Sequence, residues 1–103
     1  MIDTNIVDQI TEQFCTYIEK NHKGANKAVS NKELETVFGI KGRMIRKIVN
    51  SLRCNEIPIC SDAVGYYWGG TPQEIRATIA QLNSRIRKIS SARDGLINYL
   101  QKL

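Results

Sequence analysis

Two segments in the first part of the chain place apolar residues at helical spacing. From about Asp3 to Asn21, apolar residues recur every four positions and form one stripe: Ile6, Ile10, Phe14 and Ile18. After a polar, glycine-containing loop, Ser30 and Glu33 form a Ser-x-x-Glu capping box, which predicts the start of a short second helix. Gly39 has the position of a helix C-terminal cap and predicts its end.

The stretch from Gly42 to Leu52 has the sharpest two-faced pattern of the chain. Apolar residues at i, i+3, i+4 and i+7 form one face: Ile45, Ile48, Val49 and Leu52. Three cations and an amide form another face at the same spacing: Arg43, Arg46, Lys47 and Asn50. We therefore expect a helix that packs its apolar face on the core and offers its basic face to phosphates. A short capped helix, a glycine turn and a second helix are the helix-turn-helix pattern.

After Leu52 the pattern changes from helical to strand spacing. Residues 57–61 are rich in β-branched side chains, and Pro58 is typical of an edge strand or a strand start. Residues 62–65 carry turn residues, and residues 66–68 are aromatic and favour a strand. These features predict a β-hairpin directly after the basic helix. A very short additional strand is expected at residues 28–29.

The last third of the chain predicts a long helix. Thr71 is an N-cap residue, followed by Pro72 at the first helical position and Glu74 at the third. Apolar residues then alternate steps of four and three, so they form a heptad seam with a single charged interruption at Arg93. Weak helix formers at positions 90, 91 and 95 predict a kink or break near residues 90–95.

We expect the two halves of this helix to make different contacts. The first half closes the core, and the second half, together with Tyr99, pairs with a second copy of the chain to give a homodimer. The residues expected at the dimer contact are Ile89, Leu96, Ile97, Leu100 and Leu103. The alternative is that the segment from Ile75 to Ile86 packs against the first helix and does nothing else.

A length of 103 residues supports one core of modest size, so the expected fold class is α+β, mostly α. We divide the chain into residues 1–70, the core domain, and residues 71–103, the C-terminal helix. No apolar run is long enough to span a membrane, and the N-terminus has no cationic start followed by an apolar run. We therefore expect a cytoplasmic protein with no membrane association.

The net charge of +5 is concentrated in two parts of the chain. Residues 23–53 carry eight cations and two anions, and residues 71–103 carry six cations and two anions, whereas residues 1–22 have a net charge of −3. Basic charge clustered on predicted helices favours a nucleic-acid partner. The alternative is that these cations only keep solvated helices soluble.

The sequence carries few residues typical of catalysis or metal binding. Three cysteines, none of them in a C-x-x-C pair, and one histidine do not make a zinc site, and we expect reduced, mostly buried thiols. His22 has no nucleophile or carboxylate at a telling spacing, so we expect a surface loop residue and not a catalytic base. Only Gly39-Ile40-Lys41-Gly42 contains a fragment of a phosphate-binding loop. We expect no enzyme activity, cofactor or metal.

A family resemblance rests on three runs of residues within about 28–90. The first is Asn31-Lys32-Glu33-Leu34, the second Ile48-Val49-Asn50-Ser51-Leu52-Arg53, and the third Ile57-Pro58-Ile59-Cys60-Ser61 followed by Gly65-Tyr66-Tyr67. Together they resemble the winged helix-turn-helix domain of the biotin-repressor type, and also small winged-helix proteins of phages and prophages. The resemblance implies a three-helix core, a β-hairpin wing and a long C-terminal helix. Asn55-Glu56 stands where the family often has a glycine, and because asparagine tolerates a positive φ we expect Asn55 to make this turn. The wing tip carries Asp62 and no cation.

Two functions follow as expectations. The first is double-stranded DNA binding in phage or prophage transcription or replication control, through a recognition helix at residues 42–53. In this reading Arg43, Arg46, Lys47 and Asn50 enter the major groove, and three further cations hold phosphates: Lys32, Lys41 and Arg53. The alternative is a winged-helix module that binds or inhibits a replication or transcription factor through Tyr66, Tyr67, Trp68 and the C-terminal seam.

Overall fold

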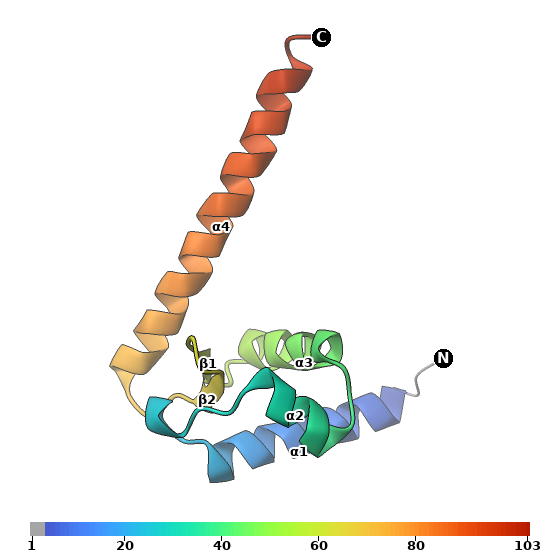
Figure 1. Ribbon diagram of the computed structural model, residues 1–103, viewed down its shortest axis with the longest axis vertical. Helices are drawn as coiled ribbons and strands as arrows, with labels where there is room; N and C mark the ends of the chain where they lie inside the picture. Colours follow the sequence, from blue (N-terminus) through green and yellow to red (C-terminus); the bar gives the residue numbers. More distant parts are fainter. Residues whose placement is uncertain (1–3) are drawn as a thin grey trace.

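The structure is a computed structural model that describes the backbone of residues 4–103 and the side chains of residues 8–103. In chain order the elements are α1 (Thr4–Asn21), the 3₁₀ helix η1 (Ala25–Lys27), α2 (Asn31–Phe38), α3 (Gly42–Cys54), β1 (Ile59–Ser61), β2 (Tyr66–Trp68) and α4 (Pro72–Leu100). Figure 1 shows the elements up to β2 gathered into one body, from which α4 extends. The predicted class, α+β and mostly α, is confirmed. The predicted start near Asp3 and the inward side chain of Ile6 lie outside the described residues.

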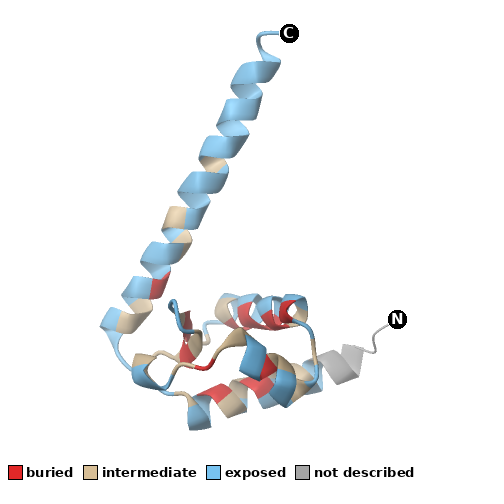
Figure 2. Ribbon diagram, viewed as in Figure 1, coloured by how far each residue is buried: buried red, intermediate tan, exposed pale blue. Residues whose placement is uncertain are grey.

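The core lies where α1, α2, α3 and the sheet meet. Its buried side chains come from each of these elements and from the segment before α2: Phe14, Ile18, Val29, Leu34, Ile45, Ile48, Val49, Leu52 and Ile59. Phe38 joins α2 to α1 through ring contacts with Phe14 (centroids 5.5 Å apart) and Tyr17 (5.4 Å). Figure 2 shows that the buried residues gather in the body, with almost none on α4.

The predicted β-hairpin is confirmed, and a third segment is paired with it. Strands β1 and β2 are antiparallel, with Cys60 opposite Tyr67. Val29 pairs with Tyr66 on the other side of β2 through two backbone hydrogen bonds, each 2.8 Å long. This is the very short strand expected at residues 28–29. The hairpin is therefore held against the core by the chain that leads into α2.

The turn after α3 differs from the prediction in one residue. The sequence assigned the left-handed conformation in this turn to Asn55, but Asn55 has a φ of −101° and Glu56 has a φ of 66°. The amide nitrogen of Asn55 instead donates to the carbonyl oxygen of Leu52, and its side chain donates to that of Ser51. These bonds extend the last turn of α3 through Asn55, so the change of direction falls on the next residue.

Helix α4 is continuous from Pro72 to Leu100, so the predicted kink or break near residues 90–95 is wrong. A serine or glycine inside a helix costs on the order of 1 kcal/mol or less but removes no backbone donor, whereas a proline does remove one. The hydrogen-bond ladder can therefore pass through this stretch. No helix of the described chain is long and apolar enough to cross a membrane.

The first half of α4 does not close the core, in contrast to the prediction. It contacts β1 through its first turns, where Thr78 is buried and its hydroxyl accepts a hydrogen bond from the Ser61 backbone (3.2 Å). Ile79 and Ile86 remain 50% and 60% exposed. Among the described residues the main core cluster includes no side chain of α4.

Glu74 fixes the base of α4 to the body. Its carboxylate accepts hydrogen bonds from the backbone N–H groups of Ala25 in η1 (2.7 Å) and Gly70 (2.8 Å). Its own amide donates to the Thr71 hydroxyl, as the predicted cap requires. The N–H groups of Ala25 and Gly70 hold the pKa of the Glu74 carboxyl below its ordinary value, because they stabilise the charged form.

We expect Glu74→Gln to lower the free energy of unfolding at pH 7, because a neutral amide replaces the charge that both N–H groups favour. A carboxyl whose pKa is depressed by folding contributes stability above its unfolded pKa of about 4.3, and this contribution is lost as the pH falls through the folded value. Urea unfolding of wild type and variant should therefore differ most at pH 6–7 and converge as the pH falls through the folded pKa of Glu74.

Glu33→Gln is the matched control for this prediction. Glu33 has the same third position in α2, and its amide donates to Ser30 as that of Glu74 does to Thr71. Within the described chain its carboxylate accepts no hydrogen bond. Equal, pH-independent effects of the two substitutions would contradict the role assigned to Glu74.

Candidate nucleic-acid interface

Helix α3 is anchored by its apolar face, as its sequence predicted. Ile45, Ile48 and Val49 are buried in the core, together with Leu52 near the end of the helix. The four residues span two turns of the helix on one side. Side chains on the opposite side must therefore point to solvent, and their direction is fixed by the core.

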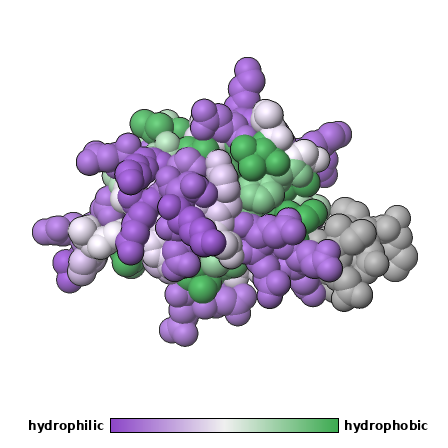
Figure 3. Space-filling view, turned by 90° about the horizontal axis from the view of Figure 1, so that it is seen from below, coloured by the Kyte–Doolittle hydropathy of each residue, from purple (hydrophilic) through white to green (hydrophobic). Residues whose placement is uncertain are grey.

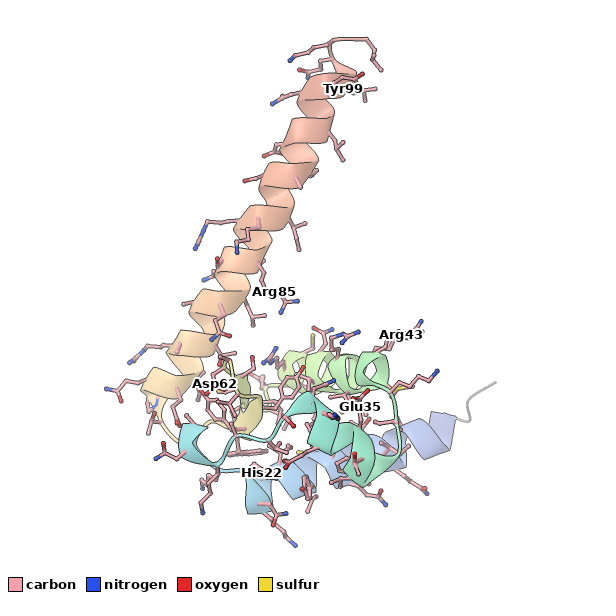
Figure 4. The ribbon with its side chains drawn as sticks, viewed as in Figure 1. His22, Glu35, Arg43, Asp62, Arg85 and Tyr99 are labelled. Atoms are coloured by element: carbon pink, nitrogen blue, oxygen red, sulfur yellow. The ribbon has the colours of Figure 1, made fainter. Side chains whose placement is uncertain are left out.

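Six of the seven residues predicted for this site are exposed. Arg43, Arg46, Lys47 and Asn50 lie on the outer face of α3. Lys41 is exposed at the N-cap position of α3, and Lys32 is exposed in the first turn of α2. Figure 4 shows Arg43 near the start of α3, directed away from the body. Among the described residues the only ion pair is Arg93–Asp94 in α4, so none of these cations is neutralised by a carboxylate within 4 Å.

Contacts between α2 and α3 hold the basic face in place. Gly39 ends α2 with a φ of 62°, which confirms the predicted glycine cap. The Glu35 carboxylate of α2 then accepts a hydrogen bond from the Gly42 amide at the start of α3 (2.7 Å; Figure 4). A Cβ atom at Gly42 would lie only 2.6 Å from the side-chain amide nitrogen of Asn31 and 3.3 Å from Glu35. A side chain at position 42 would therefore have to displace the Asn31 amide at the contact between the two helices.

Arg53 differs from the other predicted contacts. Its Nε donates to the carbonyl oxygen of Ile59 (2.7 Å) and its Nη2 to the hydroxyl of Ser61 (3.1 Å). The side chain is half-buried, and burial lowers the pKa of its guanidinium, with a further contribution from the positive charge of Arg85. Arg53 thus ties the end of α3 to β1, and this structural role was not foreseen from the sequence.

The hairpin has no cationic side chain that could contact a phosphate. Asp62 accepts hydrogen bonds from the Val64 and Gly65 amides, which closes the loop on itself. The aromatic residues named for a protein-binding surface are not free: Tyr67 is 3% exposed, and Tyr66 and Trp68 pack against the core. The hairpin thus supports α3 and presents neither cations nor a free aromatic face.

The two sides of the body differ in charge. Helix α1 lies on the side away from the free end of α4 and carries exposed Glu12 and Glu19, whereas α3 lies on the other side (Figure 1). Figure 3 shows the α1 side as largely hydrophilic with small separate apolar patches. The body therefore carries exposed acidic residues on its α1 side and exposed basic residues on its α3 side.

Two other expectations about titratable residues need correction. Cys54 is exposed, whereas Cys15 is half-buried and Cys60 is buried, so the thiols are not all covered. His22 is not a free surface residue: its Nδ1 lies 2.7 Å from the carbonyl oxygen of Lys27, and its ring packs on Tyr17. In the described part of the chain no group of three or more His, Cys, Asp or Glu residues could hold a metal ion.

Comparison of the chain with protein-family models, with curated proteins and with solved structures finds no match. A function for α3 therefore has to follow from its own geometry and charge. Helix α3 is anchored on one side by its apolar residues, and four polar residues on its other side are exposed. Two further exposed lysines, Lys32 and Lys41, lie near them.

Proposed function

We propose that this chain is a winged helix-turn-helix protein of the biotin-repressor type that binds double-stranded DNA through α3, in phage or prophage transcription or replication control. The order of elements supports this: a short capped α2, a glycine turn, α3, and then a hairpin paired on one side with the segment before α2. In this proposal residues 1–70 are the DNA-binding domain, and residues 71–103 lie outside it.

The exposed basic face of α3 is the observation that carries the proposal. The major groove of B-DNA, about 12 Å wide, admits an α-helix. Arg43 and Arg46 can each donate two hydrogen bonds to a guanine, and Asn50 can pair with an adenine in the same way. Lys47 adds positive charge to the same face, and Lys32 and Lys41 reach the phosphates.

The other parts of the body take a smaller share in this interface. The hairpin loop carries Asp62 and no cation, and Arg53 already donates to β1. We therefore leave the hairpin tip and Arg53 out of the contact set. DNA affinity then rests on α3 and the first turn of α2.

The test is binding of the purified protein to random and genomic duplex fragments across a salt series. The slope of log K against log salt should be about −3 when Arg43 and Arg46 contact bases and the three lysines neutralise phosphates, and about −4.5 when all five cations neutralise phosphates. Enrichment of one sequence would add base readout to phosphate contact. A steep slope without enrichment would contradict base readout, and no binding at low salt would refute the proposal.

The alternative function, binding of a replication or transcription factor, is favoured by one observation only. Eight large apolar side chains of α4 and the short tail after it are exposed, and five of them lie from Leu96 onward. Capture of such a factor that persists after nuclease treatment, together with failure to bind DNA, would support this alternative.

A further inference from the structure

The apolar seam of α4 has no partner within the chain. Apart from half-buried Ser90, every residue from Arg85 to the C-terminus is exposed. The exposed fractions of the large apolar side chains run from 45% at Ile97 to 86% at Leu103. Six exposed residues belong to the heptad seam (Ile79, Ile86, Ile89, Leu96, Leu100 and Leu103), and Ile97 and Tyr99 flank it. An apolar surface this long on a projecting helix marks an interaction site.

A groove continues this seam into the body. It has a volume of about 330 Å³ and lies between the base of α4 and the chain around β1. Ile57, Pro58 and Ile59 form one wall, and Ile79 and Leu82 form part of the other. Both α4 residues also belong to the seam, so an apolar helix that follows the seam toward the body ends in the groove.

The size and charge of the seam fit a second copy of the chain. Eight side chains that each expose roughly 100 Å² supply about 800 Å² per partner, the area of a standard stable interface. The flanking heptad positions between 83 and 99 carry one charge, Arg85, and otherwise hold Asn83, Ser90, Ala92, Ile97 and Tyr99. Charges at these positions select partners in coiled coils. Their scarcity here leaves little repulsion between identical helices.

The position of the body excludes a parallel pair of α4 helices. The body lies on the seam side of α4, because Ile79 and Leu82 line the groove together with the chain around β1. A parallel partner would bring a second body to the same place at the same level. It would also set the two Arg93 side chains opposite each other in one layer of the seam.

An antiparallel pair avoids both problems. Only the thin C-terminal end of the partner then reaches the groove. The Arg93 guanidinium is held aside by Asp94 (2.9 Å), so its aliphatic stem is free to pack on an isoleucine. Pairing every seam residue from Ile79 onward gives these layers, one residue from each copy: Ile79 with Leu103, Leu82 with Leu100, Ile86 with Leu96, and Ile89 with Arg93.

We propose that α4 forms an antiparallel two-stranded coiled coil with α4 of a second copy, and that the C-terminal leucines of each copy fill the groove at the base of the other α4. The two bodies then lie at opposite ends of the paired helices, each with its α3 exposed. The groove extends the interface beyond the paired helices, because it buries the C-terminal leucines of the partner. The pairing does not depend on what α3 binds.

The first experiment is sedimentation equilibrium of the full chain and two variants. The wild type should have the mass of a dimer at micromolar concentration. Leu96→Asp, in the centre of the seam, should raise the dimer dissociation constant by at least about 100-fold, since it buries an unpaired charge. Asn98→Asp adds the same charge two residues away on the opposite face and should leave the dimer intact. A monomeric wild type, or equal effects of the two variants, would overturn the proposal.

Cysteine cross-linking tests the direction of pairing. In a Cys54→Ser background, Leu82→Cys mixed with Leu100→Cys should be joined by a short bis-maleimide. Leu100→Cys alone should not, because its two copies lie about 27 Å apart along the helix axis at 1.5 Å per residue. Efficient cross-linking of Leu100→Cys with itself would indicate a parallel pair and overturn the proposal. The Cys54→Ser parent gives the background from the remaining thiols.

The outcome is separable from that of the DNA experiment. A monomer that binds DNA refutes the pairing and leaves the proposed function standing. An antiparallel dimer that binds no DNA at any salt concentration supports the pairing and refutes the proposed function.

Discussion

Replacing Arg46 and Lys47 by glutamate should weaken binding to duplex DNA by at least about 100-fold at low salt, since one Arg–guanine pair alone is worth 1–3 kcal/mol. Both side chains are exposed on the outer face of α3 and have no carboxylate partner among the described residues. The double change removes two attractive charges and adds two repulsive ones next to the phosphates. It should also flatten the dependence of affinity on salt, which filter binding or fluorescence anisotropy measures directly.

The matched control is Arg87→Glu with Lys88→Glu. These neighbours lie on exposed positions of α4 outside the apolar seam and change the net charge by the same amount. Because they lie far along the projecting helix, binding through α3 should fall several-fold at most. Equal losses of affinity for the two double variants would mean that DNA binding depends on the total charge of the protein and not on α3. Thermal unfolding of both variants should match that of the wild type.

The sequence predicted best those features whose cause is local. Ser30 and Thr71 cap α2 and α4 because their hydroxyls reach amides three residues on, and Gly39 ends α2 because it adopts the left-handed conformation at little cost. The buried face of α3 followed from spacing alone. Each of these needs only a few neighbouring residues, which the sequence displays side by side.

The errors concern features whose cause lies elsewhere in the chain. Arg53 has the spacing of a DNA contact, but its partners, Ile59 and Ser61, come beside it only after the chain has turned at Glu56. Nothing in the sequence distinguishes a guanidinium with a nearby carbonyl partner from one in solvent. For this reason our proposal leaves Arg53 out of the seven predicted contacts.

Helix α4 shows the same limit at a larger scale. Its heptad seam predicted an apolar contact along the whole length, and the sequence assigned the first half of that contact to the core. In the structure the main core cluster takes its buried side chains from α1, α2, α3, β1 and the segment at Val29, and none from α4. Ile79 and Ile86 are left exposed as a result. Which apolar surface a helix covers depends on what the rest of the chain has already covered.

Gly65→Ala should lower the free energy of unfolding by about 3 kcal/mol, through a backbone clash and the loss of hydrogen bonds. A Cβ atom at this position would lie 2.0 Å from the carbonyl oxygen of Val29 and 2.9 Å from the Cα of Ser30. Both are backbone atoms, so no side chain can turn aside. The segment at Val29 would have to leave β2, with its two hydrogen bonds to Tyr66 and the burial of Val29.

Urea unfolding of Gly65→Ala beside Gly95→Ala separates this clash from a general effect of alanine. A Cβ atom at Gly95 meets nothing within 4 Å, and alanine in a helix is favoured over glycine by about 1 kcal/mol. Gly95→Ala should therefore unfold at the same or a higher urea concentration, and Gly65→Ala at a much lower one. Because the segment at Val29 leads directly into α2, and α2 holds the start of α3 through Glu35, Gly65→Ala should also weaken DNA binding. A Gly65→Ala protein as stable as the wild type would show that β2 does not approach Val29 this closely.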